Sequence, residues 1–324
     1  MIDSFEKASI PGTSEAERKR LLSFVVVGGG PTSCEFVAEL HDFATSDIKK
    51  LYPDLIPYVK VSLSKSYKIY IKTLYTALKD VSSQNIYPFS IVFKMAVEAG
   101  PALLGPFDSN LQNYTKSLFE NRDIDVRLGT AVTAVEDYEG DGFRFPGRKA
   151  KLSDGSEIPF GTLVWSAGLK QINFSESLDL PKGKNGRLLV DDYLRVKGYE
   201  GSIWAMGDCA MNEKDPLPEL AQVARQQGMY IADIMNGKRK EDEKAFNFFN
   251  LGSMASVGGL KGLYDGHGIG PKGHEIDVPG LKGFVALLLW RFAYWGRQTS
   301  IENKILIPIY WMKSFFFGRD VSRF

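Results

Sequence analysis

Apolar positions in the N-terminal half form short uninterrupted runs and helical spacings, a pattern that predicts a sheet flanked by helices. Residues 24–27 are a continuous apolar run closed by three glycines, as in a buried parallel strand. Apolar residues recur at helical spacing over 31–44 and 108–121, which predicts two helices. Residues 58–63 alternate like a second strand, and 126–128 predict a third.

Farther along the chain the pattern changes to alternation with turn signals. Asp-Gly pairs at 141–142 and 154–155 predict a β-meander over 131–160. The start of the chain is polar, so residues 1–22 are expected to form a linker, with one helix over 13–22 that opens with a Ser14–Glu17 capping box. The other predicted elements are strands at 163–165 and 202–206 and helices at 218–235, 284–295 and 301–317.

The glycines after the first strand are candidates for binding a phosphate. Gly28 permits a tight turn, Gly30 lets a ligand approach the backbone, and the following helix offers free N–H groups and a partial positive charge. Ser33 stands where the dinucleotide fingerprint has its third glycine and is small enough for helix–strand packing. The alternative is a bare glycine turn, but the strand–turn–helix context favours a nucleotide.

A dinucleotide site needs a ribose-binding acid at the end of the next strand. Glu98 has the right chemistry, but it lies 70 residues past Gly28 (98 − 28). Residues 64–96 hold five Lys, four Tyr and no Gly, which indicates an insertion. Without them, 59–63 would run directly into 97–100 as one strand ending in the acid. A surface position for Glu98 is the alternative.

Other polar residues fit a purely structural role, and some of them also fit a binding role. Glu35, followed by Glu39, fits a helix N-terminal acid favoured by the dipole. Asp208 ends a predicted strand, where it could accept a hydroxyl or simply form a turn. Gln222 and Gln226 are adjacent on one helix, where their amides could flank a carbonyl-bearing ligand or be solvated.

Composition excludes several classes of protein. The 324 residues include 40 basic and 39 acidic side chains, which argues against nucleic-acid binding by bulk charge. Two cysteines exclude a disulfide framework, and the three histidines show no metal-ligand spacing, so no metal site is expected. The polar first 20 residues show no targeting signal, and no uncharged apolar run is long enough for an ordinary membrane span.

The C-terminal stretch 281–324 is basic and aromatic. It carries seven Lys/Arg and two Asp/Glu (7 − 2 = +5), together with eleven of the forty Phe, Tyr and Trp residues. Short helices of this composition suit an interfacial membrane anchor. The alternative is packing onto the body of the protein or onto a dimer partner.

Several blocks in the same order resemble the type II NADH:quinone oxidoreductases, above all the mitochondrial alternative NADH dehydrogenases. They are Phe-Val-Val-Val-Gly-Gly-Gly-Pro-Thr at 24–32, Glu-Phe-Val-Ala-Glu-Leu-His-Asp-Phe at 35–43, Gly-Thr-Leu-Val-Trp-Ser-Ala-Gly at 161–168, Trp-Ala-Met-Gly-Asp at 204–208, Ala-Gln-Val-Ala-Arg-Gln at 221–226 and the ending Phe-Gly-Arg-Asp-Val-Ser-Arg-Phe.

The resemblance implies an α/β fold with a Rossmann-like NADH-binding domain, part of an FAD-binding domain and C-terminal amphipathic helices. The expected boundaries are a linker at 1–22, the NADH domain at 23–160, the FAD-domain part at 161–280 and membrane-associating helices at 281–324. The family's own FAD fingerprint would lie upstream of residue 1, so the N-terminal half of the FAD domain is expected to be missing.

The resemblance also implies roles for single residues. Glu98 matches the acid that binds the adenosine ribose, and Glu35 matches a glutamate near the nicotinamide–flavin contact. Gln222 and Gln226 match glutamines beside flavin and quinone. The matched cofactor residues are Gly28, Gly29, Gly30, Pro31 and Thr32 in the NADH pyrophosphate loop, Ala167 and Gly168 at the crossing into the flavin domain, and Gly207 with Asp208 at the FAD.

The implied activity is hydride transfer from NADH to FAD and two-electron transfer to ubiquinone, without proton pumping. The implied location is peripheral, on the mitochondrial inner membrane, with a possible homodimer. Weak or absent FAD retention is expected without the upstream fingerprint. The alternatives are a catalytically silent NAD-binding, membrane-associated fragment and another FAD/NAD-dependent reductase, although the disulfide-reductase cysteine motifs are absent.

Overall fold

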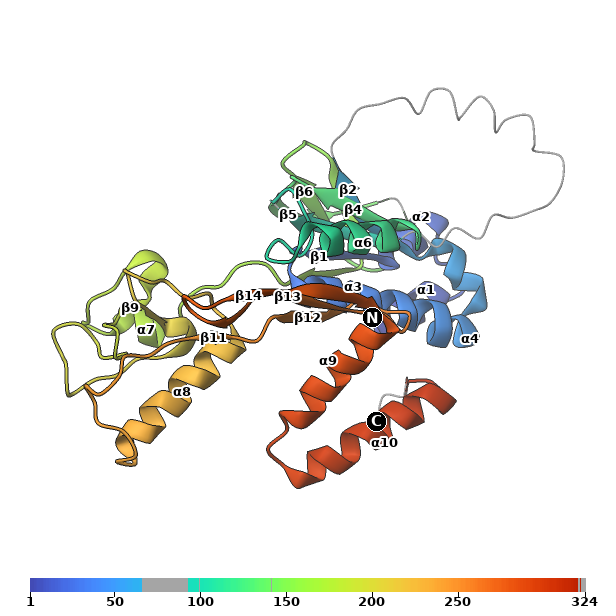
Figure 1. Ribbon diagram of the computed structural model, residues 1–324. Helices are drawn as coiled ribbons and strands as arrows, with labels where there is room; N and C mark the ends of the chain where they lie inside the picture. Colours follow the sequence, from blue (N-terminus) through green and yellow to red (C-terminus); the bar gives the residue numbers. More distant parts are fainter. Residues whose placement is uncertain (66–92, 99, 141, 320, 322–324) are drawn as a thin grey trace. The chain divides into compact units, whose positions relative to one another are not determined.

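The computed structural model describes residues 1–65, 93–98, 100–140, 142–319 and 321 (Figure 1). The chain forms two compact units. The first unit contains Met1–Ala167, Ser253–Asp265 and Gly280–Phe324, and the second contains Gly168–Gly252 and Gly266–Pro279. Each unit is described by itself.

A parallel sheet forms the centre of the first unit. Its order is β3-β4-β2-β1-β8, and all five residues of β1 are buried. The prediction of a buried parallel strand after the N-terminal segment is therefore confirmed. The strands are β1 (Ser23–Val27), β2 (Lys60–Lys65), β3 (Phe93–Glu98), β4 (Ile124–Leu128) and β8 (Thr162–Trp165).

Helix α3 (Pro31–Asp42) follows β1 and covers the sheet with its apolar face. Cys34, Val37 and Ala38 on this face are completely buried in the main core. The helix continues as a π-helical segment (Phe43–Ile48), a short α4 (Lys49–Leu51) and a 3₁₀ segment (Pro53–Tyr58). Helix α6 (Ser109–Glu120) begins at Asp108, whose side chain accepts the Asn110 N–H at 2.8 Å.

The N-terminal segment is not the polar linker that its composition predicts. It forms α1 (Ile2–Ser9) and α2 (Glu15–Leu21), and Phe5 of α1 is completely buried in the main core. The expected cap at Ser14 is present, since its hydroxyl accepts the Glu17 N–H at 3.2 Å. Glu17 is buried and accepts the backbone N–H groups of Arg144 and Phe145, so its carboxylate ties α2 to the β-meander.

Strands β2 and β3 are separate strands in this chain. The prediction that 59–63 would run directly into 97–100 as one strand without residues 64–96 concerns a shortened chain and stays a prediction. Both pair with β4 in parallel, and Lys65 and Glu98 both lie opposite Leu128. The two positions are 33 residues apart (98 − 65), which equals the length of the suspected insertion 64–96. Residues 66–92 of that stretch lie outside the described residues.

The predicted β-meander is present as an antiparallel sheet of three strands, ordered β5-β6-β7. Gly155 has φ +80° at the turn between the last two, the conformation that an Asp-Gly turn requires. The other predicted turn includes Asp141, which lies outside the described residues. The strands are β5 (Val132–Tyr138), β6 (Gly147–Leu152) and β7 (Glu157–Phe160).

The second unit is built around α8, which starts three residues later than predicted. The predicted strand at 202–206 is absent, and Trp204 makes only an isolated bridge to Arg195. This stretch is apolar because its side chains join the core that includes Tyr230 and Ile231 of α8. The elements are α7 (Asn173–Ser177), β9 (Leu188–Leu189), β10 (Ala210–Met211), α8 (Ala221–Met235) and β11 (Phe249–Asn250).

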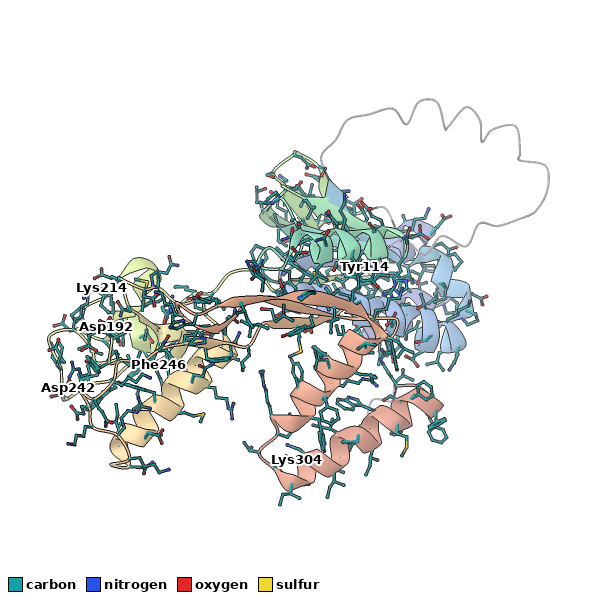
Figure 2. The ribbon with its side chains drawn as sticks, viewed as in Figure 1. Tyr114, Asp192, Lys214, Asp242, Phe246 and Lys304 are labelled. Atoms are coloured by element: carbon teal, nitrogen blue, oxygen red, sulfur yellow. The ribbon has the colours of Figure 1, made fainter. Side chains whose placement is uncertain are left out.

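A second antiparallel sheet, ordered β11-β13-β12 with β14 on β13, leads to the two predicted C-terminal helices. In α9 only Ala286 and Leu287 are buried, and α10 has no buried residue. Trp295 of α9 donates its indole N–H to the carbonyl of Lys304 at 2.8 Å. Figure 2 labels Lys304, which lies in α10 close to its connection with α9. The elements are β12 (Ser253–Ser256), β13 (Gly262–Pro271), β14 (Ile276–Gly283), α9 (Phe284–Gly296) and α10 (Ile301–Phe317). Among the described residues, no helix combines the length and apolarity needed to cross a membrane.

Candidate functional site

The glycine-rich turn joins β1 to α3 and leaves one side of its backbone open. Gly28 has φ +124°, and a Cβ there would lie 2.5 Å from the Ser33 hydroxyl oxygen, so only glycine fits. A Cβ on Gly30, the N-cap of α3, would meet no heavy atom within 4 Å. Pro31 follows at the first helical position, and the Thr32 side chain is exposed. Free helix N–H groups beside an uncovered glycine form a site suited to a phosphate.

A pair of hydroxyls fixes this turn to the end of β8. The Ser33 and Ser166 oxygens are 2.7 Å apart, and the Ser166 hydroxyl also donates to the carbonyl of Val27 at 3.1 Å. Ser33, which departs from the glycine of the fingerprint, is completely buried and uses its extra oxygen for this contact. No local sequence signal points to Ser166, because the contact spans 133 residues.

The structure places Glu98 at the C-terminal end of β3, which β4 and β2 separate from β1 in the sheet. The Glu98 side chain lies outside what the structure describes. The segment that follows nevertheless reaches the glycine-rich turn, because Leu104 donates its N–H to the carbonyl of Gly29 at 2.7 Å. The ribose-binding role of Glu98 therefore stays a prediction.

Glu35 lies in the second turn of α3 and is tied to two distant segments. Its Oε1 atom accepts the Ser256 N–H at 3.0 Å and the Trp290 indole N–H at 3.1 Å. Burial raises the pKa of the Glu35 carboxyl above its usual value; the two N–H donors oppose this shift and the negative charge of Glu39 adds to it. The sequence pattern singles out Glu35, but neither of its partners.

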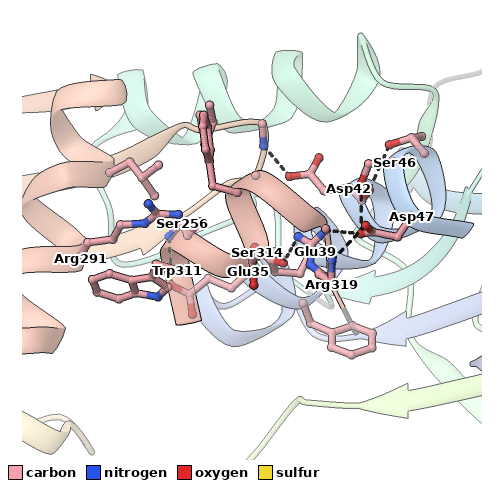
Figure 3. A pocket seen from close by; sticks show the side chains of 18 of the residues that line it. Glu35, Glu39, Asp42, Ser46, Asp47, Ser256, Arg291, Trp311, Ser314 and Arg319 are labelled. Carbon is pink, nitrogen blue, oxygen red and sulfur yellow. Dashed lines mark hydrogen bonds and ion pairs between the residues drawn. The ribbon is translucent and has the colours of Figure 1, made fainter. Parts of the chain in front are cut away.

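A cavity of about 830 Å³ opens beside Glu35 (Figure 3). Helix α3 and the π-helical segment form one side, and α9 and α10 form the other. Trp290, Trp311 and Phe315 supply aromatic walls, and Arg319 supplies a cation. The volume is in the range of small-molecule sites.

In the second unit, Gly207 and Asp208 form a tight turn against α8. Gly207 has φ +71°, and a Cβ there would lie 3.2 Å from the Ala224 Cβ. Its N–H donates to the buried amide oxygen of Gln227 at 2.6 Å, a contact that the sequence does not reveal. Asp208 is exposed, so its carboxylate is accessible to a ligand.

The amides of Gln222 and Gln226 are engaged by the backbone near β11. Gln226 accepts the N–H of Phe249 at 2.9 Å and donates to the carbonyl of the same residue at 2.8 Å. Gln222 accepts the N–H of Leu251 at 3.1 Å. In this arrangement both side chains hold β11 on α8, so their role beside flavin and quinone stays a prediction.

The chain leaves the first unit at Ala167 and enters the second at Gly168, which has φ +75°. The carbonyl of Ala167 accepts the Trp165 indole N–H at 2.8 Å, which fixes the last turn before the crossing. These two residues therefore lie at the boundary between the two compact units.

Comparisons with known proteins match two successive stretches of the chain, whose bounds differ from those of the two compact units. Residues 3–228 match the family model described as pyridine nucleotide-disulphide oxidoreductase, and residues 250–320 match the NDH2 C-terminal domain. The structure is similar to that of NDH2 from Plasmodium falciparum in complex with NADH, with a TM-score of 0.76 and 20% identity over 99% of this chain and 71% of that one. This likeness shows the fold.

Two relatives are similar in sequence over the whole chain. A probable NADH dehydrogenase of Dictyostelium discoideum is 34% identical over 100% of this chain and 61% of its own length. The mitochondrial external NADH-ubiquinone oxidoreductase 2 of Saccharomyces cerevisiae is 33% identical over 99% of this chain and 56% of its own length. The chain thus spans about three-fifths of these relatives. It belongs to the pyridine nucleotide-disulphide oxidoreductase family, in the type II NADH dehydrogenase (NDH2) branch.

Proposed function

We propose that the chain binds NADH at the turn between β1 and α3 and works as the NADH-binding part of a non-proton-pumping NADH:ubiquinone oxidoreductase. The observation that carries this proposal is the open glycine-rich turn, where Gly30 leaves the backbone at the start of α3 uncovered. The name of the Saccharomyces cerevisiae relative, an NADH-ubiquinone oxidoreductase, supports ubiquinone as the electron acceptor.

The proposed NADH contacts follow the geometry of the first unit. The N–H groups at the start of α3 hold the pyrophosphate between Gly28 and Thr32, and Glu98 holds the adenosine ribose. Glu35 stands farther along the same helix, beside the cavity, where burial raises the pKa of its carboxyl. These groups of the protein bind NADH and orient it, because the redox chemistry itself belongs to the cofactor.

The second unit offers groups that fit FAD. The Gly207–Asp208 turn presents an exposed carboxylate near α8, and the Ala167–Gly168 crossing leads to it along the chain. When bound, FAD supplies the two-electron relay between NADH and the quinone. The described residues contain one glycine-rich strand–helix turn, which we assign to NADH, so we expect FAD to be held weakly.

We further propose that α9 and α10 attach the protein to the surface of the mitochondrial inner membrane. Their large apolar side chains are unusually exposed: Phe292 is 69% exposed, Ile301 76% and Phe317 82%. Short helices with such a surface, flanked by Lys and Arg, bind at the lipid interface. A homodimer formed through the same surface is the second candidate.

Titration of the chain with NADH, followed by nicotinamide fluorescence, tests the central proposal. Gly30→Ala adds a methyl group that meets no protein atom, so we expect a folded variant whose NADH affinity falls roughly tenfold or more, about 1.4 kcal/mol. Gly296→Ala in α9 is the matched control, because a Cβ there also meets no heavy atom within 4 Å. Equal NADH affinity of all three proteins would contradict the assigned site.

Activity separates this function from its alternatives. NADH oxidation by a soluble quinone, measured with added FAD, is expected for the oxidoreductase. NADH binding without any oxidation would indicate the silent NAD-binding fragment, and oxidation with another acceptor alone would indicate a different reductase. Flotation with anionic vesicles, with and without residues 281–324, tests the membrane contact, and equal binding of both proteins would exclude it.

A further inference from the structure

The helix pair α9–α10 is tied to the same region of the first unit at two places. In the middle of α9, Trp290 donates its indole N–H to Glu35 at 3.1 Å. Just after α10, Arg319 pairs with Glu39 and Asp47. Glu35 and Glu39 are one turn apart on α3, so they lie on one face of that helix.

The contact at Arg319 has three parts. Its guanidinium lies 2.9 Å from Asp47 Oδ2 and 2.5 Å from Glu39 Oε2, and its backbone N–H donates to Asp47 Oδ1 at 3.1 Å (Figure 3). The Asp47 side chain is only 7% exposed, in the π-helical segment that follows α3. Hydrogen bonds between ionised groups in such a shielded position are among the strong ones.

Apolar packing contributes little to the position of α10. No residue of α10 is buried, and most of its large apolar side chains are exposed. Gly318 ends the helix with φ +81°, and a Cβ there would lie 2.8 Å from Asp47 Oδ1. The glycine therefore allows the chain to turn so closely against Asp47 that Arg319 reaches both carboxylates.

The space between the two attachments is the cavity beside Glu35. Trp290 of α9 and Trp311 of α10 line it, as do Glu35 and Arg319 themselves. Arg291 lies over the ring of Trp311 at 5.2 Å and joins the two helices across the cavity wall. The position of α10 thus determines how enclosed the cavity is.

We propose that α9–α10 is a strap that covers the cavity beside Glu35, and that Arg319, held by Glu39 and Asp47, is the latch that keeps the strap closed. Arg319 does not contact Glu35 and is a positioning residue that acts through α10 and α9. Loss of the latch lets α10 leave, opens the cavity and exposes the Trp290–Glu35 contact to water. This inference goes beyond NADH binding and does not depend on it.

The test uses the full chain and the variants Arg319→Glu, Glu39→Arg and their combination. Glu39 is exposed, so either charge fits its position. Hydrogen exchange of α10 and acrylamide quenching of tryptophan fluorescence report the strap, because three of the five tryptophans lie in α9 and α10. A free helix of this length is marginal in water, so an undocked α10 exchanges faster.

We expect each single charge reversal to speed hydrogen exchange in α10 roughly tenfold or more, and to increase quenching, while amides of β1 and α3 keep their protection. The double variant restores slow exchange at least in part, because the pair is present again with its charges exchanged. Arg297→Ala, in the connection between α9 and α10, is the control and leaves exchange of α10 unchanged.

Unchanged exchange of α10 in Arg319→Glu would overturn the proposal. So would a double variant whose α10 exchanges as fast as in the faster single variant. If Arg319→Glu fails to fold, Arg319→Lys replaces it. Lysine keeps the positive charge but cannot contact two carboxylates as the planar guanidinium does, so we expect α10 to exchange faster than in the unaltered chain. Equal exchange rates in the two proteins would refute the latch. NADH affinity is measured in parallel, so a failure of the proposed function appears separately, as absent NADH binding in the unaltered chain.

Discussion

The indole N–H of Trp290 donates to the Glu35 carboxylate at 3.1 Å, although 255 residues separate the two along the chain. The contact brings a residue of the C-terminal helices to the helix that begins at the glycine-rich turn. Burial at this point raises the pKa of Glu35, so the folded chain holds its proton at a higher pH than the unfolded chain does. The stability of the fold is therefore linked to pH through this residue.

The sign of this linkage gives the first prediction. At pH values between the usual carboxyl pKa and the raised pKa of Glu35, the folded state binds more protons than the unfolded state. The free energy of unfolding therefore falls as pH rises through this range. Glu35→Gln keeps the acceptor oxygen and removes the titration. We expect the stability of Glu35→Gln relative to the unaltered chain to rise with pH across this range, by about 1.4 kcal/mol per unit of pKa shift.

Urea unfolding of both proteins from about pH 4.5 to about pH 8.5 measures this difference, since the range spans the usual carboxyl pKa and the values above it. Because other titrating groups are common to both proteins, their contributions largely cancel. A stability difference that stays constant with pH would mean that Glu35 titrates as an ordinary exposed carboxyl.

The second prediction concerns Gly28, where the turn requires a glycine. Its φ is +124°, and a Cβ at this position would lie 2.5 Å from the Ser33 hydroxyl oxygen, so any substitution is strained. We expect Gly28→Ala to lower the free energy of unfolding by about 2 kcal/mol or more. Thermal unfolding measures the loss, and Gly30→Ala, whose methyl group meets nothing, is the control expected to unfold like the unaltered chain. Equal stability of the two variants would contradict the packing described for Gly28.

A third prediction follows from the hydroxyl pair of Ser33 and Ser166. Loss of either hydroxyl removes a partly buried hydrogen bond, so Ser33→Ala and Ser166→Ala are each expected to cost about 1 kcal/mol. The double variant should cost less than the sum, because both changes remove the same bond. Ser153→Ala, at an exposed turn of the β-meander, serves as the control for losing a serine hydroxyl. Strict additivity in the double-mutant cycle would show that the two hydroxyls do not interact.

The fourth prediction concerns residues 64–96. Because Lys65 and Glu98 share the same partner on β4, removal of these 33 residues leaves Glu98 opposite Leu128. We expect the shortened chain to fold with at least the same stability, since closing a shorter connection costs less entropy. Circular dichroism and urea unfolding check this, and an unfolded shortened chain would show that the segment is required for the sheet.

Sequence patterns predicted the parts whose structure depends on near neighbours. The apolar run of β1, the glycines after it and the helical spacing of α3 act over a few residues, and so do the turns of the β-meander. The prediction of a strand at 202–206 was wrong. An apolar stretch also arises where side chains pack against a helix while the backbone forms no strand-pairing hydrogen bonds. The helix α1 was missed because its polar exposed face conceals the few positions, such as Phe5, that become buried.

The sequence by itself determined the strand–glycine–helix turn and the composition of the C-terminal helices. Tertiary structure alone decided that Trp290 meets Glu35, that Ser166 meets Ser33 and that Arg319 lies between Glu39 and Asp47. Helices, strands and turns follow from backbone conformation and from the period of apolar residues, and both are visible in a short stretch of sequence. Contacts across 133 to 280 residues arise only when the whole core packs, and no local pattern encodes them.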